Sequence, residues 1–137
     1  MDYSHTFAIS ASGMSLERTR VEVAALNLAN ANTVTGADGV LFRPLRVVAQ
    51  STFRDAFAQG MAHVEAHVEP TLSAPRLVHE PGHPLADPQG FVAYAGVDSA
   101  TEMVTLMGAT RSYEANVAAM NSSRNLALKA LEIGSNA

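Results

Sequence analysis

Residues 99–133 read SATEMVTLMGATRSYEANVAAMNSSRNLALKALEI, and this stretch decides the fold. Apolar side chains recur in it three and four positions apart without a proline, which predicts one long amphipathic helix. Written as heptads, they form two rows with the 3.5-residue repeat of a coiled-coil seam. The first row contains Met103, Thr110, Val117, Arg124 and Leu131, and the second contains Leu106, Tyr113, Met120 and Ala127. At 1.5 Å per residue this helix is about 50 Å long, so it needs a partner along its length.

Both ends of this helix carry recognisable signals. The sequence Ser99-Ala100-Thr101-Glu102 is typical of a capping box, in which the Ser99 hydroxyl accepts a hydrogen bond from the Glu102 amide. The Glu102 carboxylate then reaches back to the Ser99 amide. Gly134 follows the last turn, as a glycine does after many helices. We therefore expect the helix to run from Ser99 to Ile133.

Residues 2–32 predict a second long helix with two apolar rows on nearly opposite sides. One row contains Phe7, Ala11, Met14, Val21, Ala25 and Leu28, and the other contains Ile9, Leu16 and Val23. A helix that is apolar on both sides is either the core of its own chain or packed between chains. Because only one other long helix is predicted to cover it, we favour packing between chains.

Three asparagines mark the end of the first helix, in Asn27-Leu28-Ala29-Asn30-Ala31-Asn32-Thr33. Asparagine tolerates the left-handed conformation at helix ends, so Asn27, Asn30 and Asn32 can be local caps. Alternatively, their amides form hydrogen bonds between packed helices. The sequence leaves both interpretations open.

Short extended segments follow a turn cluster at 35–39. The predicted strands are 40–48, 61–69, 77–79 and 91–94, with an ambiguous loop at 52–60 and turns at 80–84 and 87–90. Pro44 places part of the first strand at a sheet edge. The expected fold class is therefore α+β, with long N- and C-terminal helices that form an α-helical coiled-coil domain and a small β-rich insert between them. The coiled-coil domain comprises 1–35 together with 97–137, and the insert comprises 36–96.

Composition excludes several classes of protein. The 137 residues include no cysteine, so disulfides and thiolate zinc sites are absent. A net charge of −4 argues against nucleic acid as a partner. No apolar run approaches the roughly 18 residues that span a membrane, and the first residues lack the pattern of a cleavable signal peptide. Charged residues make up only 16%, which suits a surface that packs against other protein.

One alternating stretch raises the possibility of a metal site. His63, Glu65, His67 and Glu69 would share one face of a strand, and His79 and His83 could join them. Alternating histidine and glutamate are also ordinary on a solvated strand face, and we favour that interpretation. The sequence contains neither a Gly-x-Ser-x-Gly elbow nor a phosphate-binding loop. We expect no catalytic site, no cofactor and no bound metal, and therefore no enzyme.

Several motifs resemble one protein family. Ser12-Gly13-Met14 and the asparagine motif over 27–33 resemble the N-terminal signature of bacterial flagellar rod and hook proteins. The C-terminal half is similar to the proximal rod members of that family. The segments that carry this similarity are 80–87 (EPGHPLAD), 96–98 (GVD), 102–104 (EMV) and 111–117 (RSYEANV). Residues 49–75 match little, and Leu26 stands where the family often has a small polar residue.

The resemblance implies a structural role in an axial filament. Such proteins leave the cell through the flagellar type III export apparatus without a cleaved signal. They stack helically, with other copies and other rod proteins, into the rod of the basal body, the drive shaft that crosses the periplasm and transmits torque to the hook. Their terminal helices form the inner tube, and the middle segment forms an outer domain. Neither nucleic acid nor direct insertion into a membrane is implied.

We expect the apolar rows and the asparagines to form the assembly interface. Its residues are Phe7, Met14, Val21, Asn27, Leu28, Asn30, Asn32, Met103, Leu106, Tyr113, Val117, Met120 and Leu131. Two other functions remain open at this stage. One is a metal-binding module built on His63, His67 and their glutamates, and the other is a coiled-coil adaptor unrelated to flagella.

Overall fold

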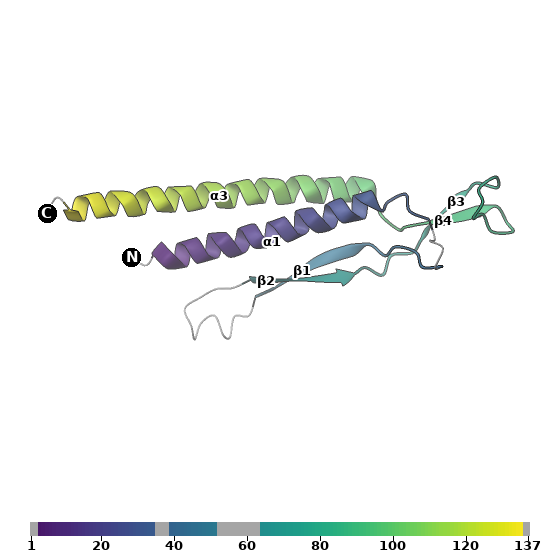
Figure 1. The fold of residues 1–137 in the computed structure, drawn as a ribbon, viewed down its shortest axis with the longest axis horizontal. Coiled ribbons are helices and arrows are strands. Elements are labelled where there is room, and N and C mark those ends of the chain that lie inside the picture. The colour runs from purple at the N-terminus through teal and green to yellow at the C-terminus, as the bar shows by residue number, and fades with distance from the viewer. Residues whose placement is uncertain (1–2, 35–38, 52–63, 136–137) are drawn as a thin grey trace. The chain divides into compact units, whose positions relative to one another are not determined.

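The structure is a computed structural model and describes residues 3–34, 39–51 and 64–135 (Figure 1). In chain order its elements are α1 (Tyr3–Ala29), β1 (Leu45–Ser51), β2 (Val64–Pro70), β3 (Arg76–His79), β4 (Phe91–Tyr94) and α3 (Ser99–Ser135). β1 pairs with β2 and β3 pairs with β4, so the described strands form two separate two-stranded sheets. Two terminal helices flank this β-rich segment in the sequence, which confirms the predicted α+β class.

Element boundaries differ from expectation where backbone hydrogen bonds decide them. α1 ends at Ala29 rather than at residue 32, because the amide of Ala31 donates to the carbonyl of Leu28 in a tighter turn. The strand expected over 40–48 begins only at Leu45, because Pro44 has no N–H to donate to a partner strand. β3 and β4 confirm the strands expected at 77–79 and 91–94.

Two further expectations fall partly on residues that are not described. The strand expected over 61–69 is described from Val64 and continues to Pro70. Its first four side chains alternate as predicted, with Glu65 and His67 exposed and Val64 and Ala66 half-buried, but Val68 is exposed and Glu69 is half-buried, so the alternation stops after His67. The loop expected at 52–60 lies outside the described residues.

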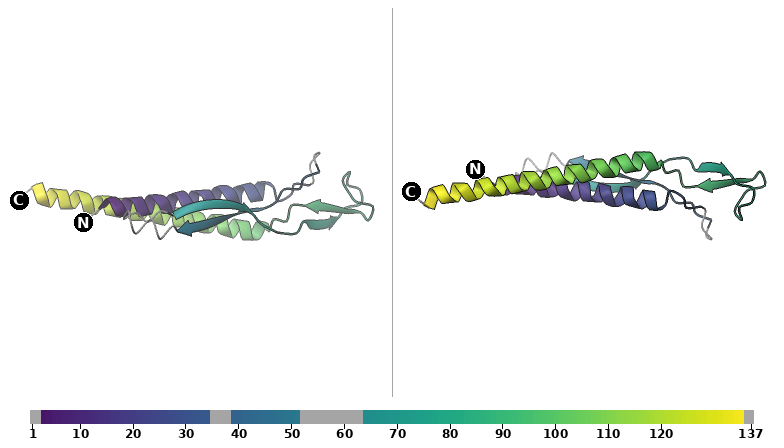
Figure 2. Two further views of the ribbon diagram at one scale, coloured as in Figure 1. Left: turned by 90° about the horizontal axis from the view of Figure 1, so that it is seen from below. Right: turned by 90° about the horizontal axis from the view of Figure 1, so that it is seen from above.

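The chain divides into two compact units, and each helix contributes to both. The first unit comprises Met1–Thr19, Val48–His67 and Gly108–Ala137, and the second comprises Arg20–Val47 and Val68–Met107. Within the first unit the start of α1 and the end of α3 run antiparallel beside each other (Figure 2). Gly13 permits their close approach, because a Cβ there would lie only 2.9 Å from the amide nitrogen of Asn116.

The core of the second unit lies beside the residues that follow α1 and precede α3. It consists of Ala31, Ala95 and Val97, with Phe42 packed against them. The amide of Ala95 donates to the carbonyl of Thr33 at 3.1 Å, and Val34 forms a β-bridge with Tyr94. These contacts join the segment after α1 to the end of β4.

Gly96 marks the tightest backbone approach in this core. A Cβ at this position would overlap the carbonyl oxygen of Ala74. A backbone atom cannot rotate aside as the end of a long side chain can, so only glycine fits here. The approach sets the path of the chain between β4 and α3.

The β3–β4 hairpin has an antiparallel register from Arg76 opposite Tyr94 to His79 opposite Phe91. Asp87 organises its loop, since its Oδ1 accepts the amides of Gln89 at 2.9 Å and Phe91 at 2.8 Å. Gly90 adopts a φ of +83°, a conformation that favours glycine.

One aromatic residue ties the base of this hairpin together. The Tyr94 hydroxyl donates to the Glu80 carboxylate at 2.9 Å, and this hydrogen bond raises the pKa of Tyr94. The Arg76 guanidinium lies 5.0 Å from the centroid of the Tyr94 ring, within the range of a cation–π contact. Arg76 also donates to Oδ1 of Asn32 at 3.4 Å.

α3 begins with a different cap from the one expected. Asp98, rather than Ser99, is the capping residue: its Oδ1 accepts the Ala100 amide at 3.0 Å and its Oδ2 accepts the Thr101 hydroxyl at 2.8 Å. The Glu102 amide donates to the carbonyl of Asp98, so Ser99 is already the first helical residue. The expected Ser99–Glu102 capping box was therefore wrong. The three hydrogen bonds to the Asp98 carboxylate, from the Thr101 hydroxyl first and then from the amides of Thr101 and Ala100, lower the pKa of its carboxyl.

Candidate assembly interface

Asn27 is the most highly connected of the expected interface residues. Its side chain is 0% exposed and its Nδ2 donates both to the carbonyl of Leu45 at 2.8 Å and to Oε1 of Glu102 at 3.0 Å. Its Oδ1 accepts the amide of Leu45 at 2.9 Å. One side chain therefore joins α1, the start of β1 and the first turn of α3. The bond from Asn27 to Glu102 is of the kind that the second interpretation describes, an amide hydrogen bond between two helices, here within one chain.

The other two asparagines behave differently. Asn30 bonds locally, with its Nδ2 donating to the Leu26 carbonyl at 2.8 Å and its Oδ1 accepting from the Thr33 hydroxyl at 3.2 Å. This is the capping role that the sequence left open. Asn32 is exposed and accepts from Arg76 of β3. The three residues thus divide between the two interpretations.

The buried positions of α1 include several small and polar residues beside the apolar Val23. Ser10, Glu17 and Ala24 repeat every seven positions, and Ala31 continues this spacing just after the helix ends. This is a heptad spacing in which most side chains are small or polar. Such residues let another helix approach closely, as the contact of Gly13 with Asn116 illustrates. Apolar periodicity finds Val23 but misses Ser10, Glu17 and Asn27, because these buried residues are not apolar.

The less exposed positions of α3 mix small and polar residues with apolar ones. They are Glu102, Leu106, Ala109, Asn116, Val117, Met120, Ser123 and Ala127. Of the predicted row of Leu106, Tyr113, Met120 and Ala127, all but the exposed Tyr113 belong here. The other predicted row began at Met103. In the structure the corresponding row lies one residue earlier, at Glu102, Ala109, Asn116 and Ser123, because small and polar side chains permit the close helix approach there.

The structure places the remaining expected interface residues at or near the surface. Met103 is 55% exposed, Tyr113 is 39% exposed and Leu131 is 70% exposed. The other apolar residues of the set are half-buried, namely Phe7, Met14, Val21, Leu28, Leu106, Val117 and Met120.

Several large apolar side chains of α3 are exposed in the single chain. We call this set the outer face of α3; it comprises Met103, Val104, Met107, Leu126, Leu128, Leu131 and Ile133, which are distributed around the helix rather than along one side of it. Exposed apolar residues in such numbers on one helix mark a surface that packs against another protein. The outer face is therefore the candidate interface of this chain.

Metal ligands do not cluster in the described part of the chain, where no group of three or more histidine or acidic residues could hold an ion. His67 Nε2 lies 3.8 Å from Oε2 of Glu65 on the same strand. His83 Nδ1 accepts the Leu85 amide at 3.1 Å, and the His79 ring packs edge-on against Phe91. His63 lies outside the described residues.

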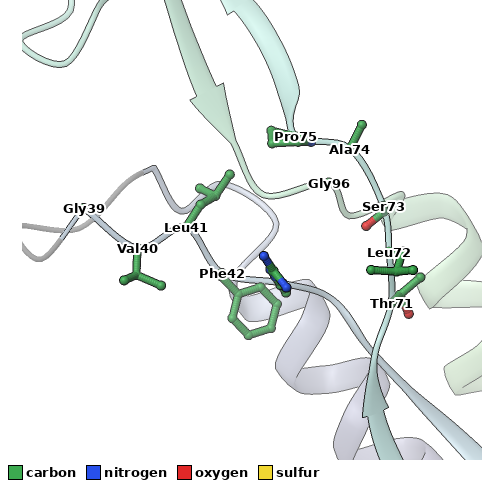
Figure 3. Close-up of a pocket in the computed structure, with 11 residues that line it drawn as sticks. Gly39, Val40, Leu41, Phe42, Thr71, Leu72, Ser73, Ala74, Pro75 and Gly96 are labelled. Carbon is green, nitrogen blue, oxygen red and sulfur yellow. The ribbon is translucent and has the colours of Figure 1, made fainter.

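A hollow of about 620 Å³ opens between residues 39–43 and 71–75, with Gly96 at its wall (Figure 3). The amide of Thr71 donates to the carbonyl of Pro44 at 2.7 Å, at the edge of this hollow. Arg43 is the one charged residue among those that line it. A single arginine among apolar and small side chains offers no acid–base pair for catalysis.

Neither of the described helices is both long enough and apolar enough to cross a bilayer.

Comparisons with known proteins give a consistent result. Residues 7–37 match the family model "Flagella basal body rod protein", and residues 89–133 match "Flagellar basal body rod FlgEFG protein C-terminal". The flagellar basal-body rod protein FlgC of Escherichia coli O6:H1 is 43% identical over 128 residues, which cover 93% of this chain and 95% of the relative. FlgC of Salmonella typhimurium is 41% identical with the same coverage. FlgC of Bacillus subtilis is 34% identical over 95% of this chain and 97% of its own length.

Proposed function

We infer the function of this chain from its family: the chain belongs to the family of the flagellar basal-body rod protein FlgC, and it is a structural subunit of the flagellar basal-body rod. The observation that carries this conclusion is identity above 40% over nearly the whole of both chains. The chain therefore works in the basal body, among other rod components.

We further propose that the chain polymerises helically as part of the proximal rod, the shaft that transmits torque from the motor to the hook. The outer face of α3 supports this proposal, because its large apolar side chains are exposed in the single chain. Covering each square ångström of apolar surface contributes about 25 cal/mol, so many such contacts stabilise a filament. Contacts between unlike surfaces that do not close into a ring generate an open helix.

We propose the same two domains that the sequence suggests. Residues 1–35 together with 97–137 form the inner, helical domain, and residues 36–96 form the outer domain. The supporting feature is Asn27, which joins both helices to the start of β1 and thus fixes the insert to the helical domain. The proposed interface residues of the inner domain are the thirteen expected from the sequence except Asn27, which is buried within its own chain; Met103 and Leu131 are the most exposed of the apolar ones.

Export and location follow the family pattern in this proposal. The chain passes through the flagellar type III export apparatus without a cleaved signal and assembles where the rod crosses the periplasm. We also propose that it has no catalytic activity and requires neither cofactor nor metal. The structural role supports this, since a rod subunit acts through its contacts and not through chemistry at a site.

Complementation tests the proposed function. The chain is produced in a bacterium from which its own FlgC has been deleted, and swimming and the number of complete basal bodies per cell are measured. We expect both to be restored. Cells that export the chain but contain no basal bodies would contradict a role as rod subunit. Growth with a metal chelator tests the proposal that no metal is required. Basal bodies purified from chelator-treated cells should contain as much of this chain as basal bodies from untreated cells.

A further inference from the structure

The β3–β4 hairpin carries an exposed apolar surface outside the helices. We define the hairpin face as Leu77, Leu85, Asp87 and Phe91. Leu77 is 64% exposed and Leu85 is 52% exposed. These four residues line a pocket of about 140 Å³, together with Val34, Val92 and Ala93. A cavity of about 150 Å³ is large enough for benzene, so this pocket has room for one aliphatic side chain.

The charge of the hairpin face constrains what can bind there. Asp87 is the one charged residue among those lining the pocket. Its Oδ1 is held by the amides of Gln89 and Phe91, which fixes the carboxylate at the rim. Residues 80–91 contain two acids and no lysine or arginine. The fitting occupant is an aliphatic side chain with a positive charge close to it.

The last turns of α3 carry this complementary chemistry. We define the C-terminal ridge as Arg124, Leu128 and Leu131, which share one side of the helix because positions three and four apart are neighbours. Leu128 is 49% exposed and Leu131 is 70% exposed. Residues 121–135 contain two basic residues, Arg124 and Lys129, against the single acid Glu132. The ridge is therefore aliphatic and positive where the hairpin face is aliphatic and negative.

We propose that the hairpin face of one copy receives the C-terminal ridge of a second copy. A ridge leucine fills the pocket, and Arg124 lies next to Asp87. This inference rests on the proposed rod function and names a partner surface for it. Because the two surfaces differ, each bound copy still presents one free hairpin face and one free ridge, so the contact is heterologous and can continue from copy to copy.

Disulfide trapping tests the contact directly, because the chain has no cysteine of its own. Chains with Leu85→Cys and chains with Leu128→Cys, carrying different tags, are produced together in cells that lack their own FlgC. Purified basal bodies are then oxidised. We expect a disulfide-linked dimer that carries both tags. The matched control pairs Leu72→Cys with Leu128→Cys, because Leu72 is 97% exposed but lies outside the hairpin face; this pair should give no dimer.

The outcomes separate this inference from the function on which it rests. Complete basal bodies without the mixed dimer would overturn the inference and leave the rod function standing. A disulfide between either cysteine and a different rod protein would overturn the choice of a second copy. Absence of basal bodies even with the unmodified chain would contradict the rod function, and the inference would fall with it.

A second measurement needs no thiols. Leu85→Asp adds a carboxylate beside Asp87 and removes an aliphatic wall of the pocket. We expect about tenfold fewer basal bodies per cell, the size of effect expected when one buried leucine contact is lost. Leu72→Asp makes the same chemical change at an exposed position and should leave the number unchanged. Equal numbers from the two variants would overturn the inference.

Discussion

The less exposed positions of α3 and its outer face differ in a way that sequence periodicity does not show. The less exposed positions combine small or polar residues, such as Ala109, Asn116 and Ser123, with the half-buried Leu106, Val117 and Met120. The outer face includes Met103, Leu128 and Leu131, which are large, apolar and exposed. A soluble helix usually buries its largest apolar residues within its own chain. Here the single chain buries only part of the apolar surface of α3, and the rest is left for contact with neighbours.

This difference separates two kinds of substitution. Changes on the inner side, or in the core that joins the helices to the strands, should lower the stability of the isolated chain. Changes on the outer face should leave that stability intact and impair assembly instead. The expected loss of stability from each substitution of the first kind can be ranked by the contacts that the replaced residue makes.

Gly96→Ala should have the largest effect on the isolated chain. Its new Cβ would overlap the carbonyl oxygen of Ala74, and the backbone must shift to relieve the overlap. We expect the free energy of unfolding to fall by about 3 kcal/mol, the upper part of the range for overpacking. Urea denaturation of the purified chain measures this. A change below about 1 kcal/mol would mean that the approach to residue 74 is not tight.

Asn27→Ala should come next. It leaves the amide and carbonyl of Leu45 and the carboxylate of Glu102 without the hydrogen bonds that Asn27 makes. Because these buried polar groups lose their partner, we expect the free energy of unfolding to fall by about 2 kcal/mol in total. Asn32→Ala is the matched control, since Asn32 is exposed and its removal should change stability by less than about 0.5 kcal/mol. Equal effects of the two variants would refute the central role of Asn27.

The two helix glycines give a finer comparison. Gly108 has open space around it, so Gly108→Ala should stabilise the chain by about 1 kcal/mol through helix propensity. Gly13→Ala gains the same propensity but pushes against the Asn116 amide, so its net gain should be smaller. Adding Asn116→Ala to Gly13→Ala should recover the difference. Thermal unfolding by circular dichroism measures all three variants, and a Gly13→Ala gain equal to that at Gly108 would contradict the close approach.

Asp98→Asn should have the smallest effect, and one that depends on pH. The hydrogen bonds from Thr101 and Ala100 lower the pKa of Asp98 below its ordinary value of 3.8. The ionised carboxylate therefore stabilises the folded chain fully above pH 3.8, and this contribution disappears as the pH falls through the lowered pKa. Asparagine also caps helices well, so the loss at neutral pH is small.

The measurement is the thermal midpoint of both chains at pH 7 and at pH 2. We expect the wild-type chain to be more stable than Asp98→Asn at pH 7 and the difference to shrink at pH 2. Ser99→Ala is the control and should show no such pH dependence, because Ser99 lies inside the helix. A larger loss from Ser99→Ala than from Asp98→Asn would restore Ser99 as the cap.

Much of the fold follows from local sequence. Long periodic segments without proline predict both helices, and strands at 77–79 and 91–94 follow from apolar residues bounded by turn signals at 80–84 and 87–90. The cap of α3 could not be fixed in the same way. Asp98 and Ser99 are both good capping residues, and only the extra hydrogen bond from the Thr101 hydroxyl favours Asp98.

The inner side of the helix pair was harder to predict than the elements themselves. Apolar periodicity ranks positions by hydrophobicity, whereas Ser10 and Glu17 are buried although they are polar. The asparagine motif indicated that polar residues take part in helix contacts. Its spacing alone cannot tell which asparagine is buried, Asn27 or Asn30. That distinction depends on the tertiary neighbours Leu45 and Glu102, which lie far away in the sequence.

We expect rod neighbours to pack on the outer face of α3. Leu131→Asp is the sharpest test, because Leu131 is 70% exposed in the single chain. In cells without their own FlgC, we expect this variant to be produced and exported but to yield few or no basal bodies. The free energy of unfolding of the purified variant should lie within about 0.5 kcal/mol of that of the wild-type chain. Normal swimming and a normal number of basal bodies with Leu131→Asp would contradict the claim.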